Sequence, residues 1–579
     1  MDDPSWCRAC RTAAAADVTL TREVPPEDRT EPVDEAVPPV RRWYAPSLPG
    51  LWGGLILACL TFTPSLLPRS GVLQGAVAGI GAILGYGLGV LVALVWRAFA
   101  GRGPRRARGR SLAVFGIVAV LLVVASVLAG RYWQGELRTL MGAPAQSWGD
   151  TLLAVPVALV AFVVLFALCR ALFLLGRGLG RLLSRWMGRR GARALGGLVV
   201  AAVVVYLVSG LALDGLFAAT DRAFAAANDE TPAGVSRPTS DLRSGGPESL
   251  IGWDTLGREG RIFVAGGPSG ADIARFTGTR AAEPIRIYAG VDSADTAEDR
   301  AALAVADLER AGGFDRARLL VATTTGQGWL DAGTMSSFEY VAGGDSAIVA
   351  LQYSFVPSGF SYLVDASRAQ AAGRALFDAV YGKWASLPVD HRPQLYVFGE
   401  SLGSFGGEAA FSGESDLRNR TSGALFVGPP NFNALHTEFR DGRDPGSREV
   451  EPVYRNGRTV RFSTDIDAGA PPVGAPWDGS RTLILQHPSD PITWWSPRLL
   501  FSRPDWLAEP RGRDVLPAMT WLPVVTFWQV TLDMPAAADV PEGHGHRYTR
   551  ESVDAWATLL RPPDWTPQKA DQLRAIISP

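Results

Sequence analysis

Residues 397–407 read VFGESLGSFGG, and this stretch decides how the C-terminal half of the chain folds. It follows the start of an apolar strand pattern, QLYVF, and it leads into a helix start rich in small residues, GSFGGEAAF. This context predicts a tight strand-to-helix turn with Ser401 at its apex. Gly399 and Gly403 suit such a turn because backbone segments approach too closely there for side chains. The G-x-S-x-G pattern alone is weak in a chain with 64 glycines, so its context carries the prediction.

Ser401 is therefore a candidate nucleophile, and the alternative is a small residue in a glycine-rich connection. A serine hydroxyl needs a base, and the base needs an orienting acid. For a serine on this kind of turn, the expected order along the chain is serine, acid, histidine. The chain holds five histidines: His391, His436, His487, His544 and His546.

The order along the chain favours the C-terminal loop EGHGHRY as the source of the base. His544 is the first choice for the base, and His546 is the close alternative. The non-catalytic alternative is that both are surface histidines. The acid should leave a strand end between the serine and the base. RTLILQHPSDPITWW supplies Asp490 directly after an apolar strand, where Asp-Pro forces a turn. Asp465 and Asp467 are alternatives.

Two backbone N–H groups should stabilise the oxyanion of the tetrahedral intermediate. One is expected from Leu402, immediately after the candidate nucleophile. The other is expected from the segment LLVATTTGQGW, where Thr325, Gly326 or Gln327 could donate. An ordinary turn is the alternative for that segment.

From about residue 251, short β-branched segments alternate with helical patterns, which predicts a mostly parallel sheet covered by helices on both faces. The predicted strands are RIFVAGG, PIRIYAGV, ARLLVATTTG, SAIVALQYSF, QLYVFGES, GALFVGPP and RTLILQHPSD. Helices are predicted within 296–312 and 366–387. The first of these should begin after Thr296, because acidic residues follow it.

The first part of the chain has a different composition. It contains five apolar runs, at 51–67, 71–96, 111–130, 151–175 and 195–219. A helix needs about 20 apolar residues to cross a bilayer core, and these runs show no polar stripe. They predict an α-helical transmembrane domain of about five spans. The first run contains Pro64 and is the weakest.

Arginines predict the orientation in a plasma membrane. They cluster between the second and third runs and between the fourth and fifth, and short basic loops stay in the cytoplasm. The N-terminus is then cytoplasmic, and the chain beyond about residue 220 is extracytoplasmic. The net charge of −1 gives no reason to expect a nucleic-acid partner. Cys7 and Cys10 form a lone CxxC without further metal ligands, so no metal or other cofactor is expected.

Four regions follow from these patterns. They are a disordered tail at 1–48, the transmembrane domain at 49–220, a linker at 221–250 and the sheet domain at 251–579. Within the sheet domain, 431–480 and 493–540 are predicted additions to the sheet. The aromatic residues of 493–540 could cap the active site, lie at the depth of lipid headgroups or simply pack under a long loop.

Several segments together are similar to membrane-anchored bacterial α/β-hydrolases, which pair a multi-span N-terminal domain with a C-terminal hydrolase domain. The segments are IRIYAGVDSADTAEDRAALAVADLERAG, TTTGQGWLD, GGDSAIVALQYSF, FGESLGS, LQHPSDPITWW and GHGHRY. The resemblance implies an α/β-hydrolase domain and a triad of Ser401, Asp490 and either His544 or His546. The segment TTTGQG departs from the His-Gly-Gly-Gly loop of better-studied lipases.

The expected activity is hydrolysis of an ester or thioester of a lipid-like acyl substrate through an acyl-enzyme, with membrane lipids as partners. Acyl transfer to a lipid or sugar alcohol and a non-enzymatic scaffold are the alternatives. A transporter is disfavoured because the apolar runs carry almost no internal charge. The sequence gives no basis for an oligomeric state.

Overall fold

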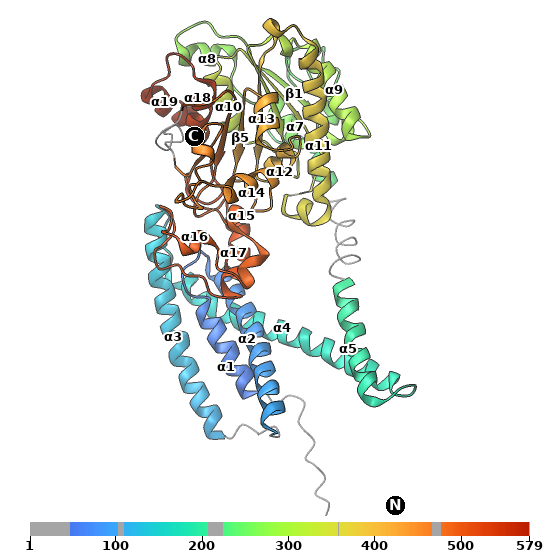
Figure 1. Cartoon of the computed structure of the whole chain (residues 1–579), viewed down its shortest axis with the longest axis vertical. Coiled ribbons are helices and arrows are strands. Elements are labelled where there is room, and N and C mark those ends of the chain that lie inside the picture. The colour runs from blue at the N-terminus through green and yellow to red at the C-terminus, as the bar shows by residue number, and fades with distance from the viewer. Residues whose placement is uncertain (1–46, 102–108, 207–223, 357, 466–475, 578–579) are drawn as a thin grey trace, which may run out of the picture. The chain divides into compact units, whose positions relative to one another are not determined.

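The computed structural model describes residues 47–101, 109–206, 224–356, 358–465 and 476–577 (Figure 1). The predicted disordered tail, with Cys7 and Cys10, therefore lies outside the described residues except for its last two. Asp467 also lies outside them.

Five apolar helices come first: α1 (Leu48–Leu60), α2 (Gly71–Ala100), α3 (Gly109–Leu140), α4 (Trp148–Leu183) and α5 (Arg189–Tyr206). Of the described helices, α2, α3 and α4 are long and apolar enough to cross a membrane. The prediction of about five spans is therefore too high for the described chain. The 13 residues of α1 extend about 20 Å, short of a hydrocarbon core of about 30 Å. Part of the fifth predicted run, up to residue 219, lies outside the described residues.

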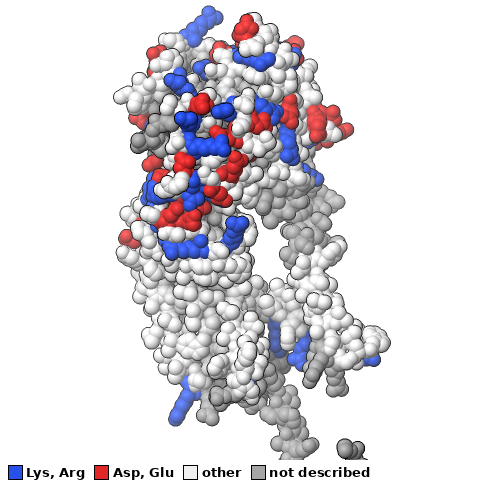
Figure 2. Space-filling model, viewed as in Figure 1, with Lys and Arg blue, Asp and Glu red and all other residues white. Residues whose placement is uncertain are grey.

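The distribution of charge agrees with a membrane-spanning role for these helices. On the face that Figure 2 shows, acidic and basic side chains gather over the sheet domain, and the middle of the bundle of α1–α3 carries almost none. Many large apolar side chains on these helices are exposed, among them Leu121, Leu159 and Val164. Such a surface suits hydrocarbon and not water.

The sheet has seven parallel strands in the order β1-β3-β2-β4-β5-β7-β6. The strands are β1 (Ile285–Ala289), β2 (Arg318–Thr323), β3 (Ser346–Leu351), β4 (Gln394–Glu400), β5 (Gly423–Val427), β6 (Val460–Ser463) and β7 (Arg481–Leu485). The predicted fold class is confirmed. The strand that ends at the candidate nucleophile is the central one, and all but its first residue are buried.

Two strand assignments need correction. The predicted strand RIFVAGG lies mostly in a helix, α7 (Gly257–Ala265), which packs on β1, with the Phe263 and Tyr288 ring centroids 5.9 Å apart. A short apolar run fits a buried helix as well as a strand, so periodicity could not separate the two. The prediction also missed β6, an edge strand of only four residues.

Helices cover both faces of the sheet (Figure 1). On one face lie α9 (Ala297–Arg310), α11 (Ser358–Ser386) and α12 (Leu402–Glu408); on the other lie α10 (Ala332–Val341) and α18 (Glu551–Leu560). The Thr296 side chain accepts a hydrogen bond from the Asp299 N–H, which confirms the predicted start of α9. Further α-helices are α8 (Gly270–Thr277), α13 (Glu414–Arg420), α14 (Ala434–Asp441), α15 (Pro491–Trp494), α16 (Asp505–Ala508), α17 (Val525–Asp533) and α19 (Pro567–Ile577).

The segment 493–540, which we call the insertion, contains the end of α15 and all of α16 and α17. It shares a hydrophobic core with the membrane helices. Trp494 and Trp506 are buried in one cluster with Leu66 and Leu67 from the α1–α2 connection and with Leu137 from α3. Trp494 and Trp506 therefore pack in a hydrophobic core, which is one of the three roles predicted for the aromatic residues of this segment.

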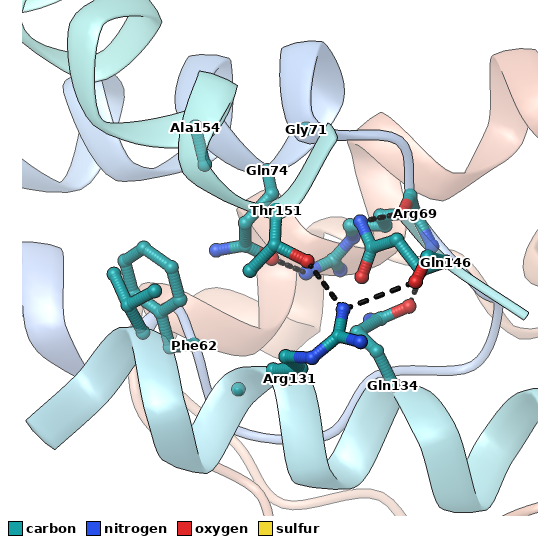
Figure 3. Close-up of a pocket in the computed structure, with 11 residues that line it drawn as sticks. Phe62, Arg69, Gly71, Gln74, Arg131, Gln134, Gln146, Thr151 and Ala154 are labelled. Atoms are coloured by element: carbon teal, nitrogen blue, oxygen red, sulfur yellow. Dashed lines mark hydrogen bonds between the residues drawn. The ribbon is translucent and has the colours of Figure 1, made fainter. Parts of the chain in front are cut away.

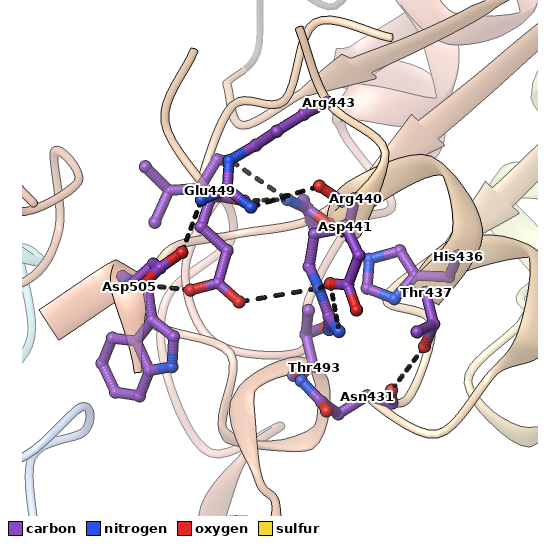
Figure 4. Close-up of polar contacts among 12 residues, drawn as sticks. Asn431, His436, Thr437, Arg440, Asp441, Arg443, Glu449, Thr493 and Asp505 are labelled. Carbon is purple, nitrogen blue, oxygen red and sulfur yellow. Dashed lines mark hydrogen bonds and ion pairs between the residues drawn. The ribbon is translucent and has the colours of Figure 1, made fainter. Parts of the chain in front are cut away.

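Polar contacts join the same two regions. Arg69 and Asp533 form a buried ion pair, with Nε 2.7 Å from Oδ1, and the Gln529 amide donates to the carbonyls of Thr61 and Thr63. On its other side, the insertion is tied to the sheet domain near α14 by ion pairs, including Arg443 with Asp505 (Figure 4).

Candidate active site

Ser401 occupies a strained turn between β4 and α12. Its φ of 53° and ψ of −126° are unusual for a residue with a side chain. Such a conformation costs on the order of 1–3 kcal/mol and persists only where its surroundings enforce it. The Ser401 N–H donates to the Val427 carbonyl at 2.9 Å, and the Ser401 carbonyl accepts from the Ser404 hydroxyl at 2.6 Å. Hydrogen bonds from two sides therefore hold the turn.

Both glycines of the predicted turn are sterically required. A Cβ at Gly399 would lie 2.5 Å from the Gly403 carbonyl oxygen. A Cβ at Gly403 would lie 2.4 Å from the Thr323 carbonyl oxygen, at the end of β2. The structure thus places Gly399 and Gly403 where backbone segments touch, as the sequence predicts.

Asp490 and His546 form a buried pair at the end of β7. Nδ1 of His546 lies 2.6 Å from Oδ2 of Asp490, whose side chain is fully buried. Asp490 also accepts from the Ile492 N–H at 2.8 Å and from the Tyr548 hydroxyl at 2.7 Å. These donors fix the carboxylate, and the carboxylate in turn fixes the orientation of the imidazole.

The His546 ring lies beside the turn that carries Ser401. A Cβ at Gly428 would come within 2.4 Å of Cε1 of His546, so the ring rests directly on the Gly428 backbone. Gly428 follows Val427, whose carbonyl accepts the Ser401 N–H. Nε2 of His546 is buried and makes no hydrogen bond to any residue that the structure describes. His546, Asp490 and the backbone of the Ser401 turn therefore lie around Gly428, and no hydrogen bond joins the His546 ring to Ser401.

His544 belongs to a different pair. Its Nδ1 lies 3.2 Å from Oδ2 of Asp514, an aspartate in the insertion. Asp514 also accepts from the Ser489 hydroxyl at 2.5 Å, and that hydroxyl accepts from the Gly545 N–H. Burial alone would raise the pKa of Asp514, but hydrogen bonds from His544 and Ser489 lower it. The preference for His544 as the partner of Asp490 is therefore not what the structure shows.

His487 is a third buried histidine at this edge of the sheet. Its Nδ1 lies 2.9 Å from the Gly545 carbonyl, its Nε2 lies 3.2 Å from Oε1 of Glu551, and its ring stacks on Tyr548. Burial lowers the pKa of His487, but the Glu551 carboxylate outweighs burial and the pKa is raised. Both ring nitrogens face acceptors, which suits a protonated imidazole that fixes the C-terminal loop.

The other candidates lie elsewhere. His391 is exposed. His436 is fully buried against Gln486, and burial lowers its pKa to about 3, so it stays neutral. Asp465 lies near Arg513, at 3.7 Å.

Glu400, next to Ser401, is a feature that the sequence reasoning did not single out. Burial raises the pKa of Glu400 well above its ordinary value, and the nearby carboxylates of Asp331, Asp490 and Glu542 raise it further. Burial thus disfavours the charged form of Glu400.

The loop after β2 passes close to the start of α12. The Thr323 carbonyl touches Gly403, as described above, and Gly328 has a φ of 92°. The Gln327 carbonyl accepts from the Gln352 amide at 2.9 Å, and the Gly328 carbonyl accepts from the Tyr288 hydroxyl at 2.7 Å. The Thr325 N–H already donates to the Trp329 carbonyl. The sequence offers Gly326 and Gln327 of this loop as candidates for the second oxyanion donor, beside Leu402 at the first position of α12.

A serine on a strained strand-to-helix turn, delivered by the central strand of a parallel sheet and followed by an aspartate and a histidine, is the arrangement of the α/β-hydrolase fold. Comparison with protein families agrees. Residues 285–573 match a model described as an alpha/beta-hydrolase family, and residues 62–268 match the model of the N-terminal region of that family. The chain belongs to this family of α/β-hydrolases with a distinct N-terminal domain. Neither a curated protein nor a solved structure matches the chain.

Proposed function

We propose that this protein is a serine hydrolase that cleaves an ester or thioester of a lipid-like acyl substrate. The observation that carries the proposal is the strained turn of Ser401 beside the His546–Asp490 pair. Strain of this kind collects at functional sites, because ordinary connections relax to unstrained conformations.

In the proposed mechanism, Nε2 of His546 takes the proton of the Ser401 hydroxyl as Oγ attacks the acyl carbonyl. Asp490 holds the proton on Nδ1, which leaves Nε2 free to act as the base. The N–H of Leu402 and a second N–H from Gly326 or Gln327 stabilise the oxyanion. His546 then protonates the leaving group, and a water molecule activated by the same ring releases the acyl group from Ser401.

The lipid-like substrate and the location of the site follow from the membrane helices. The α1–α2 connection packs into the same core as the insertion, which holds the catalytic domain against the bundle. Arg97 and Arg181 lie in the last turns of α2 and α4, at the other ends of these helices. We therefore assign the hydrolase domain to the extracytoplasmic face of the plasma membrane, which requires the chain to cross once more between α4 and the sheet domain. A cytoplasmic N-terminus requires, in addition, that α1 crosses.

A fluorophosphonate probe on membranes tests the proposal. The probe should label the wild-type protein and His544→Ala, and it should not label Ser401→Ala. His546→Ala should be labelled much less strongly than wild type. It is the matched comparison for His544→Ala, because both histidines belong to one short loop. Labelling of Ser401→Ala equal to wild type would exclude Ser401 as the nucleophile. Product analysis with water and lipid alcohols as acceptors would separate hydrolysis from acyl transfer.

A further inference from the structure

A small polar cavity lies between α2, α3 and α4, close to the α1–α2 connection (Figure 3). Its volume is about 20 Å³, room for one or two groups the size of a water molecule. Its polar wall is formed by Arg69, Gln74, Arg131, Gln134, Gln146 and Thr151. The cavity therefore combines two guanidinium groups with a ring of neutral hydrogen-bonding side chains.

Arg69 is almost completely buried at this cavity. Its Nε is bound to Asp533 of α17, and its Nη1 donates to Oε1 of Gln74 at 3.3 Å. Its Nη2 is buried and has no hydrogen-bond partner among the described residues. One donor of a buried cation is thus left without an acceptor.

Arg131 adds a second positive charge. Its Nη1 donates to the Gln146 carbonyl and to the Thr151 hydroxyl, both at 3.0 Å, and no described carboxylate forms an ion pair with it. Arg138 and Asp150 flank the cavity and carry opposite charges, so they offset each other. Arg69 is paired with the carboxylate of Asp533, whereas the Arg131 guanidinium lies over the Trp148 ring at 3.9 Å and is bound to neutral acceptors. One positive charge at the end of the membrane helices therefore has no carboxylate partner within the described chain.

A second, apolar groove adjoins the polar cavity at Phe62, which lines both. The groove has a volume of about 340 Å³, in the range of small-molecule sites. It runs between α1, α2, α3 and α4, and its walls include Leu55, Ala82, Tyr86, Ala158 and Phe162. Figure 3 shows the Phe62 ring at one side of the polar cavity, and a Cβ at Gly130 would lie only 2.8 Å from it.

We propose that the two cavities form one site for a long-chain fatty acid. The carboxylate would bind Arg131 and Nη2 of Arg69, and the alkyl chain would lie in the groove beyond Phe62. A cation without a carboxylate partner, beside an unpaired buried donor of Arg69 at the end of a membrane helix bundle, is a position suited to an anionic ligand. A carboxylate matches the fork of a guanidinium, whereas the small polar cavity has no room for a phosphodiester headgroup.

The site is connected to the catalytic loop. Arg69 bridges to Asp533 of the insertion, and Leu67 of the same connection lies against Gly545, with a Gly545 Cβ only 3.4 Å from Cδ2 of Leu67. Gly545 separates His544 from His546. A fatty acid bound at Arg69 would thus contact the α1–α2 connection, which packs against the loop of His544 and His546. A fatty acid is also a product of the proposed hydrolysis, but the binding site does not depend on that reaction.

A photoreactive palmitic acid carrying a diazirine and an alkyne tests the proposal on the full chain in phosphatidylcholine nanodiscs. The protein should carry Ser401→Ala, which removes acylation of Ser401 as a source of signal. Labelling should be saturable, map to α2 or α4, and be competed by palmitate but not by hexadecanol. In this background, Arg131→Gln should lower labelling at a subsaturating probe concentration at least fivefold.

A pair of groove variants keeps the test independent of the arginine. Ala82→Phe fills the groove and should reduce labelling as strongly, whereas Ala167→Phe adds the same ring at an exposed position of α4 and should leave it unchanged. Thermal unfolding would show that each variant is folded. Equal competition by hexadecanol, unchanged labelling in both Arg131→Gln and Ala82→Phe, or displacement by phosphatidylglycerol would overturn the fatty-acid site.

Discussion

Two histidine–aspartate pairs lie in the same part of this molecule, and their histidines are two residues apart. His546 is bound to Asp490 at 2.6 Å and rests on the turn next to Ser401, whereas His544 is bound to Asp514 at 3.2 Å. In the first pair, Nε2 of His546 makes no hydrogen bond to any described residue. The second is tied through Asp514 to the Ser489 hydroxyl. An Asp–His contact is therefore insufficient to define a catalytic base; what distinguishes His546 is that its ring contacts the backbone beside the Ser401 turn.

The largest expected effect comes from removing each imidazole in turn, which tests which of the two histidines is the catalytic base. His546→Ala should lower kcat/KM for a p-nitrophenyl ester by about 10⁶-fold, the loss typical of a catalytic base that works with a serine. His544→Ala should lower it less than about tenfold, because its ring positions the loop and does not reach the reacting atoms. Steady-state kinetics on purified protein measures both.

A reversed ranking, with His544→Ala the more damaging variant, would assign the base to the Asp514 pair. Ser401→Ala serves as the reference for complete loss.

Replacing the acids sharpens the same contrast. Asp490→Asn keeps the shape of the site but removes the charge that holds the proton on Nδ1 of His546, so kcat should fall by about 10⁴-fold. Asp514→Asn removes the equivalent charge beside His544 and should change kcat less than about tenfold. The measurement is kcat at saturating substrate, with the melting temperature as a control for folding. Similar losses in the two variants would mean that both pairs serve the reaction.

The sequence predicted the site up to the point where backbone conformation decided the outcome. Ser401, Asp490 and the histidine loop were identified because an apolar strand precedes each of the first two and because the order along the chain is restrictive. The choice between His544 and His546 depends on Gly543 and Gly545, whose φ values are 84° and 54°. Left-handed glycines turn the two rings toward different carboxylates. The sequence GHGHRY does not determine these φ values, because glycine adopts positive and negative φ about equally readily.

The fold shows the same limit. Long, strongly patterned segments such as α9 and the central strands were predictable. The sequence predicts a strand where the structure has the helix α7, because a short buried run has no periodicity of its own. Asp514 could not be found, because it comes from the insertion and reaches the loop only through tertiary packing. The sequence does contain a sign that Tyr548 is buried near the site, because it is an aromatic residue two positions beyond His546 in an otherwise polar loop.

Tyr548 allows a finer test of the Asp490 pair. Its buried hydroxyl donates to Oδ2 of Asp490 and accepts from the His487 N–H at 2.9 Å. Tyr548→Phe leaves that N–H without an acceptor, which should lower the free energy of unfolding by about 1–3 kcal/mol. It should also lower kcat/KM about tenfold, because Asp490 loses one of its fixed donors. Unfolding in denaturant and steady-state kinetics measure the two effects, and a loss of stability with unchanged kcat/KM would show that the remaining donors suffice to hold Asp490.

The smallest effect that we expect concerns His487 and pH. The Glu551 carboxylate outweighs burial and raises the pKa of His487 above 6.5, so the pair stabilises the fold fully below about pH 6.5. This contribution is lost as the pH rises through the raised pKa. The melting temperature of the wild type should therefore fall between pH 6.5 and 9 more steeply than that of His487→Gln, whose side chain does not titrate. The difference should be worth less than about 2 kcal/mol, the size of a hydrogen bond to a charged group. Parallel pH profiles of the two proteins would show that His487 is neutral when folded, and the stacked ring would then hold the loop without its charge.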